Sequence, residues 1–144
     1  MSKVTIKGHG LTSGVAEGEA LVTSEPFGFA HGIEPATGEI TDTVHEWRGK
    51  KVAGKVLVFP YSKGSSTGGV FALQSAKMGN APAAVITLKA DPVTAIGFIM
   101  ADVFYGKKIP LVDQLEQNPL KVIKTGDWVK VDATKGIVEV SQKH

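Results

Sequence analysis

The chain contains no cysteine. It therefore has no disulfide framework and no thiolate nucleophile, and it cannot by itself ligate an iron–sulfur cluster through cysteine. It does not need cross-links to fold, because a chain of 144 residues buries about 68% of its unfolded surface. The composition, 42% hydrophobic and 21% charged, is that of an ordinary globular protein, and we expect a single domain over residues 1–144.

Basic clusters and long apolar runs are scarce as well. The 16 lysines and arginines are scattered, and the formal net charge is only +2, so the basic stripe typical of nucleic-acid-binding proteins is missing. No apolar run approaches the about 18 residues that cross a membrane, and residues 1–10 lack the apolar core of a signal peptide. We therefore expect a cytoplasmic protein that contacts neither nucleic acid nor membrane.

Glycines punctuate the first half of the chain and separate short β-prone pieces such as VTIKG and GEALVT, so we expect strands joined by turns there. The pattern then changes to an alternation of strands and helices. Residues 52–60, 83–88 and 108–112 are short apolar runs typical of buried strands. Residues 70–78, followed by a Gly-Asn stop signal, are typical of a helix.

A second helix is expected to start at Asp91-Pro92, which supplies an N-cap and a first-turn proline. Apolar residues then recur at i, i+3, i+4, i+7 and i+11, the spacing of one helical face. The members of this apolar stripe are Val93, Ile96, Gly97, Met100 and Phe104.

Strands that alternate with helices pair in parallel through right-handed crossovers. The C-terminal segment returns to strand-like alternation, with Val129 and Val131 on one face, and closes as a hairpin around residues 135–136. The predicted fold is therefore a mixed α/β domain, in which a parallel βαβαβ core is flanked by antiparallel strands.

The stretch YSKGSSTGG, residues 61–69, lies between the first of these strands and the first helix. In open α/β sheets, ligands gather at the carboxyl ends of strands, where helix amino termini offer free N–H groups. The stretch is therefore the candidate functional site. The alternative is a purely structural role, in which Ser65, Ser66 and Thr67 only cap the helix.

Two familiar motifs fit this stretch poorly. A Walker A loop requires Lys and then Ser or Thr where Val70 and Phe71 stand. A G-x-S-x-G nucleophile elbow is matched around Ser66, but the histidine that activates such a serine should follow it in the chain, where only the terminal His144 is found. A serine hydrolase that uses Ser66 is the lesser alternative.

A serine can also act as a general base when its alkoxide is stabilised by clustered N–H donors, a nearby cation and the exclusion of water. A glycine-rich loop at the start of a helix supplies the donors. The sequence does not show the cation or the lid, so it indicates half of an active site. The alternative from another functional class is a module that binds a phosphate or carboxylate without turning it over.

Other polar residues offer weaker candidates. The four histidines lack the spacing of three to five residues and the H-E-x-x-H motif of metal sites, and His45 with Glu46 is interpreted as a surface pair. Among the carboxylates, the candidates for acid or base work are Asp42, Asp91, Asp102 and Asp113. Asp91 is, however, explained as a cap and Asp102 as a solvated helix position. Asp113, at the end of the third strand, could reach the serine-bearing rim or could simply end the strand. We predict no metal site in this chain.

Five further pieces of sequence together resemble a known family. They are P-x-T-G-x-I at residues 35–40, G-x-x-x-x-G-K-V-L-V-F-P at 49–60, K-G-S at 63–65, A-P-A-A at 81–84 and I-P-L-V-D at 109–113. Over roughly residues 8–138, the chain resembles the small, swivelling subunit of aconitase X-type dehydratases.

The resemblance implies a swivelling β/β/α domain that lays its serine loop over a large partner subunit carrying iron or an iron–sulfur cluster. The first serine after the glycine, here Ser65, would accept the proton in a hydro-lyase reaction, and the partner's metal would act as a Lewis acid on the leaving hydroxyl. Gly64, Ser66 and Thr67 would bind the substrate or the alkoxide. The chain alone is expected to bind no cofactor and to be inactive.

Members of this family dehydrate a hydroxy acid, either phosphomevalonate or cis-3-hydroxyproline. This chain departs from the family pattern at residues 28–32, where GFAHG stands in place of a typical Ser-Phe-x-Gly-Gly segment. His31 could be a new ligand or acid, or a solvent-facing loop residue. The resemblance therefore leaves the substrate open.

Overall fold

The computed structural model describes residues 3–30, 32–63 and 68–142. Within these residues the strands of the main sheet are β1 (Lys3–Lys7), β2 (His9–Gly10), β3 (Val15–Val22), β6 (Val56–Phe59), β7 (Ala84–Thr87), β8 (Leu111–Asp113), β9 (Trp128–Asp132) and β10 (Ile137–Ser141). A separate two-stranded pair consists of β4 (Ile33–Glu34) and β5 (Glu39–Ile40). The helices are α1 (Gly68–Lys77), α2 (Pro92–Tyr105) and α3 (Pro119–Val122).

Strand β3 joins an antiparallel half of the sheet to a parallel half. The strand order is β1-β10-β9-β3-β6-β7-β8-β2. The first part of β3 pairs antiparallel with β9, and its last three residues pair parallel with β6. Strands β6, β7 and β8 run parallel to one another, with α1 and α2 as the crossovers, and β9 and β10 form the C-terminal hairpin. The predicted parallel core with flanking antiparallel strands is confirmed.

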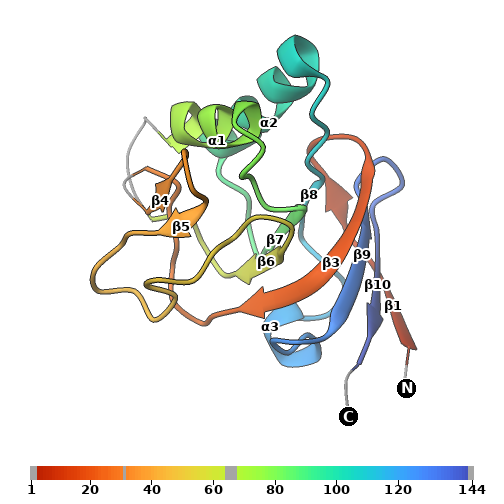
Figure 1. Ribbon diagram of the computed structural model, residues 1–144. Coiled ribbons are helices and arrows are strands. Elements are labelled where there is room, and N and C mark those ends of the chain that lie inside the picture. The colour runs from red at the N-terminus through yellow and green to blue at the C-terminus, as the bar shows by residue number, and fades with distance from the viewer. Residues whose placement is uncertain (1–2, 31, 64–67, 143–144) are drawn as a thin grey trace.

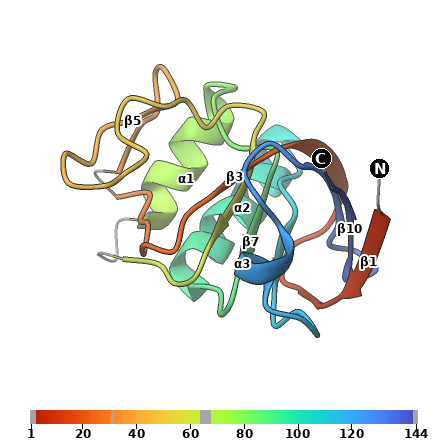
Figure 2. The same ribbon diagram turned by 90° about the horizontal axis from the view of Figure 1, so that it is seen from below.

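The parallel strands are covered on both faces. Helices α1 and α2 lie on one side of β6 to β8, and β9, β10 and β1 curl over the other side, which gives a β/β/α layering (Figure 1). Helix α3 lies at the opposite end of the molecule from α1 (Figures 1 and 2). Leu57 and Phe59 belong to the core under the helices, whereas Val56 and Val58 belong to the core between the two halves of the sheet. All four positions of β6 are therefore apolar and buried.

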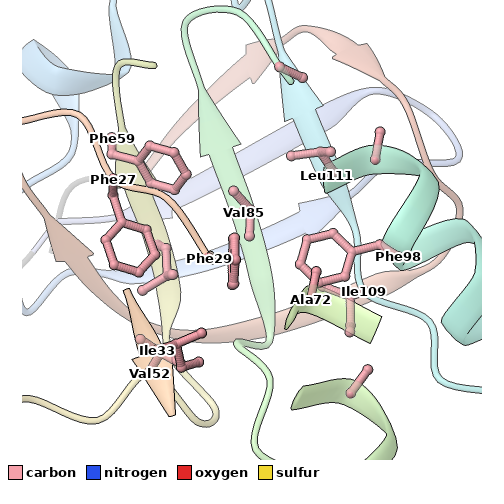
Figure 3. Close-up of a cluster of buried hydrophobic side chains, with 14 of the residues drawn as sticks. Phe27, Phe29, Ile33, Val52, Phe59, Ala72, Val85, Phe98, Ile109 and Leu111 are labelled. Atoms are coloured by element: carbon pink, nitrogen blue, oxygen red, sulfur yellow. The ribbon is translucent and has the colours of Figure 1, made fainter. Parts of the chain in front are cut away.

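The core under the helices is rich in aromatic rings. Phe27 packs edge-on against Phe29 and Phe59, with ring centroids 5.5 Å apart in both pairs. Phe29 in turn meets Phe98 of α2 at 5.5 Å with the ring planes at 90° (Figure 3). These contacts fix residues 27–29 between β6 and α2.

His45 is part of this core, so the predicted surface pair with Glu46 is wrong. The His45 side chain is only 2% exposed, and its ring centroid lies 5.5 Å from that of Phe27 and 5.1 Å from that of Trp47. Its Nδ1 accepts a hydrogen bond from the backbone N–H of Trp47 at 3.0 Å. Glu46 instead accepts a hydrogen bond from the Thr23 hydroxyl. The turn directs the imidazole into the core, whereas the polarity of histidine had favoured a position on the surface.

The cap predicted for α2 is confirmed. The Asp91 carboxylate accepts hydrogen bonds from the backbone N–H groups of Val93 at 3.2 Å and Thr94 at 3.3 Å, and Pro92 occupies the first turn. The helix ends at Gly106, whose φ of 65° is left-handed.

None of the described helices is long and apolar enough to cross a membrane.

The apolar stripe that the sequence shows on α2 is, however, mostly not its buried face. Three members of the stripe, Ile96, Met100 and Phe104, are exposed. The side that packs on the rest of the molecule consists mainly of smaller residues, and α2 is therefore apolar on both sides. The buried residues of α2 are Thr94, Ala95, Gly97, Phe98 and Ala101.

Helices α1 and α2 cross at two glycines. A Cβ atom on Gly97 would overlap the carbonyl oxygen of Gly69, and a Cβ on Gly69 would lie 2.5 Å from the carbonyl oxygen of Val93. The crossing thus requires residues without side chains. It brings the first turn of α1 against the first half of α2, close to the ends of β6 and β7.

Candidate functional site

A pocket of about 460 Å³ opens at the carboxyl ends of β6 and β7. Because these strands are parallel, the loops that follow them emerge at the same edge of the sheet, the edge at which α/β proteins bind ligands. The loop after β6, the loop after β7, the starts of α1 and α2, and the segment beside Phe29 form its walls. The lining residues are Gly28, Phe29, Tyr61, Ser62, Lys63, Gly68, Lys89, Ala90, Asp91, Val93 and Thr94.

The serine-bearing stretch is bounded by residues of this pocket. Lys63 and Gly68, the described residues on either side of residues 64–67, both line it. The predicted site residues themselves lie outside the described residues, so their roles stay predictions. They are Gly64, Ser65, Ser66 and Thr67.

Two lysines bring positive charge to the pocket. Lys63 donates a hydrogen bond from Nζ to Oδ2 of Asp42 at 2.6 Å. Within the described part of the chain, Lys89 has no ion-pair partner, and it is exposed. The sequence alone did not show a cation at this site. The clue in the sequence that could have identified these cations is that each lysine lies just beyond the end of a predicted parallel strand. Parallel strands end at the same edge of the sheet, so the two lysines are brought to the same site.

The bond from Lys63 is the main reason why the pKa of Asp42 lies below its ordinary value of 3.8. Partial burial of the carboxyl opposes this shift, and a hydrogen bond from the backbone N–H of Val44 at 3.2 Å supports it. The carboxylate of Asp42 thereby stays ionised and holds the Lys63 ammonium beside the pocket.

This ion pair predicts a dependence of stability on pH. Because the pKa of Asp42 is lower in the folded than in the unfolded state, its stabilising effect is present above about pH 4 and is lost as the pH falls through the folded-state pKa. Lys63 is partly exposed, so the effect is at most about 1 kcal/mol. We expect the unfolding free energy of the wild type to fall more than that of Asp42→Asn between about pH 6 and about pH 3. Urea titrations at both pH values measure the difference, and parallel losses would contradict it.

Two carboxylates on α2 have structural partners. Oδ2 of the capping Asp91 also accepts a hydrogen bond from the Thr94 hydroxyl at 2.8 Å. Asp102, predicted to be a solvated helix residue, forms an ion pair with Nζ of Lys108 at 2.9 Å. Asp91 thus contributes to the pocket wall while its oxygens are engaged with the helix.

Asp113, at the end of β8, is buried and holds the loop after β7. Its carboxylate accepts a hydrogen bond from the backbone N–H of Ala90 at 2.9 Å, and the other oxygen lies 3.0 Å from Nδ1 of His9. Asp113 does not line the pocket. Of the two interpretations of this residue, the strand-end role is the one that the structure favours, and its effect is to position the loop that carries Lys89.

No histidine of the described segments lines the pocket. His9 is bonded to Asp113, and His45 is buried among aromatic rings, while His31 and His144 lie outside the described residues. The described residues also contain no group of three or more His, Asp or Glu side chains that could hold a metal.

Gly28 and Phe29, the first two residues of the segment that departs from the family pattern, line the candidate site. Phe27, just before this segment, donates a hydrogen bond from its backbone N–H to the Tyr61 carbonyl at 3.1 Å and accepts one from the N–H of Lys63 at 3.2 Å. A Cβ atom on Gly28 would overlap the carbonyl oxygen of Lys63. This contact joins residues far apart in the chain, so sequence reasoning missed it.

Comparison with known proteins agrees with this architecture. A family model described as the aconitase X swivel domain matches residues 5–140. The phosphomevalonate dehydratase small subunit of Methanocella arvoryzae is 46% identical over 136 residues, which cover 94% of this chain and 98% of that protein. The subunit of the same name from Methanosarcina acetivorans is 39% identical, with 97% of this chain and 93% of that protein covered.

A solved structure shows the same fold. The aconitase X of Thermococcus kodakaraensis, in its holo-form, superposes with a TM-score of 0.86 at 38% sequence identity. The match covers 96% of this chain and 99% of that chain. The family model matches residues 5–140 and the superposition covers nearly the whole chain, and the chain therefore belongs to the aconitase X swivel domain family.

Proposed function

We propose that this chain is the small subunit of a phosphomevalonate dehydratase, in which Ser65 is the general base and a large subunit completes the active site. The observation that carries the proposal is that Lys63 and Gly68, on either side of the segment with Ser65, line a pocket at the ends of two parallel strands. The names of relatives at 46% and 39% identity favour phosphomevalonate over cis-3-hydroxyproline.

The reaction removes water across two neighbouring carbons of the substrate. The alkoxide of Ser65 takes the proton from the carbon beside the carboxylate, the C–H electron pair becomes the new C=C bond, and the hydroxyl on the next carbon leaves. Gly64, Ser66 and Thr67 offer N–H and hydroxyl groups to the substrate or to the alkoxide. The iron or iron–sulfur centre that the family resemblance implies is expected on the large subunit.

The charges of the pocket suit a phosphorylated hydroxy acid. Phosphomevalonate carries a carboxylate and a phosphate, and two lysines, Lys63 and Lys89, line the pocket. The carboxylate of Asp91 also lines it, but its oxygens accept hydrogen bonds from the first turn of α2. Lys63 precedes Ser65 by two residues in the chain and is held by Asp42. A positive charge near a serine hydroxyl would favour its ionised form. Lys89, which has no ion-pair partner in the described part of the chain, is available to an anionic group of the substrate.

The test is to reconstitute the chain with an aconitase X large subunit and assay phosphomevalonate and cis-3-hydroxyproline side by side. We expect the pair to dehydrate phosphomevalonate and each subunit alone to be inactive. Turnover of hydroxyproline alone would contradict the substrate. Binding of phosphomevalonate without turnover would indicate an anion-binding module, and labelling of Ser66 by a serine-directed phosphonate would favour a hydrolase.

A further inference from the structure

The solvent side of α2 is unusually apolar. Ile96, Val103 and Phe104 are 55%, 73% and 64% exposed. Asp102 is the charged residue of this helix, and it is engaged with Lys108. A helix that is apolar on all sides is normally buried on all sides, so this surface lacks a cover in the isolated chain.

The exposed apolar residues continue across the crossing of the two helices. Between α1 and α2 lies a groove of about 220 Å³, at the point where Gly69 and Gly97 bring the backbones together. Its walls are Val70, Leu73, Val93, Ile96 and Met100. Contiguous apolar surface of this kind marks sites of interaction with other molecules.

The groove is continuous with the candidate active site. Val93 lines both the groove and the pocket, and Gly68 of the pocket is followed directly by Gly69 of the groove. A body that fills the groove therefore overlies the edge of the pocket. The proposed chemistry requires a second polypeptide at this edge, because the alkoxide must be shielded from water.

We propose that the large subunit docks on the α1–α2 face, which we define as Val70, Ile96, Met100, Val103 and Phe104. Docking buries this face and closes the pocket in the same step. The identity of the partner rests on the proposed function, whereas the exposure of the face is a property of this chain.

The rim of the face indicates what the partner presents. Beyond the carboxyl end of α2 the chain carries Lys107, and Nζ of Lys77, the last residue of α1, lies 5.8 Å from the centre of the Tyr105 ring. The complementary surface on the large subunit is therefore an apolar patch bordered by acidic side chains.

Lysine substitutions on α2 test this interface. Ile96→Lys and Val103→Lys place a charge at exposed positions, so the fold is retained, and the melting temperature of each variant verifies this. Each is expected to raise the Kd for the large subunit by about tenfold or more, measured by titration calorimetry without substrate. The matched control is Trp128→Lys, because Trp128 is 49% exposed and begins β9, at the end of the molecule away from α1 (Figure 1). Its Kd should equal that of the wild type.

Three results would overturn the inference. The first is unchanged binding by both α2 variants, and the second is the absence of any binding between the wild-type chain and the large subunit. The third is a homodimer of this chain that the α2 substitutions dissociate, which would assign the face to a second copy. A wild-type pair that binds through this face but does not dehydrate phosphomevalonate would contradict the proposed function and leave the interface intact.

Discussion

Replacing Ser65 by alanine is expected to lower the kcat of the reconstituted dehydratase by about 10²- to 10⁴-fold, the usual contribution of a general base. The methyl group cannot accept the proton that must leave the substrate carbon. The substitution removes a single oxygen atom, so assembly with the large subunit and the KM should change little. Steady-state kinetics on the purified pair, with sedimentation analysis of its assembly, measure both parts of this expectation.

The adjacent serine provides the control. Ser66 is proposed to bind the substrate or stabilise the alkoxide, so Ser66→Ala should mainly raise the KM and leave most of kcat. Full turnover by Ser65→Ala would remove the mechanism. If Ser66→Ala were inactive and Ser65→Ala were active, Ser66 would be the catalytic serine, and the nucleophile-elbow interpretation would be favoured.

Replacing Gly28 by alanine is expected to cost about 3 kcal/mol of the unfolding free energy, a value at the high end for a residue forced into a packed site. The new Cβ would overlap the carbonyl oxygen of Lys63 and lie 3.0 Å from its carbonyl carbon. The two segments have little freedom to separate, because the backbone of Phe27 is hydrogen bonded to both Tyr61 and Lys63. Chemical denaturation of the isolated chain measures the loss.

The same substitution should also reduce kcat, since a shift of Lys63 moves the start of the segment that carries Ser65. Gly54→Ala is the matched control: its Cβ would meet nothing within 4 Å, and only the positive φ of 74° opposes it. That backbone strain is expected to cost about 1 kcal/mol of the unfolding free energy. Gly54 does not line the pocket, so kcat should be unchanged. Equal kinetic effects of the two variants would show that Gly28 has no particular role at the site.

Much of the fold was predictable because the relevant signals are local. The run at Val56–Phe59 is apolar at every position, which is the signature of a strand covered on both faces. The cap and proline at Asp91-Pro92 specify where α2 begins, since the Asp91 carboxylate accepts hydrogen bonds from the first N–H groups of the helix and Pro92 has no N–H group to satisfy. The alternation around Val129 and Val131 specifies a hairpin strand with one buried face.

The errors share one physical origin. The periodicity of α2 identifies an apolar face but not what covers it, and the sheet packs against the other side, through Ala95, Phe98 and Ala101. The polarity of His45 favours the surface, yet the aromatic rings around it bury it. In both cases the deciding contacts come from segments that are distant in the chain.

The sequence by itself therefore determined the parallel core with its two long helices, the C-terminal hairpin and the family of this protein, because each depends on patterns among neighbouring residues, whereas the short helix α3 was not predicted. The tertiary structure alone decided that Lys63 and Lys89 share a pocket, that Gly28 abuts Lys63, and which side of α2 is left exposed. These facts depend on how the sheet brings remote loops to one edge, and no local pattern of side chains encodes that juxtaposition.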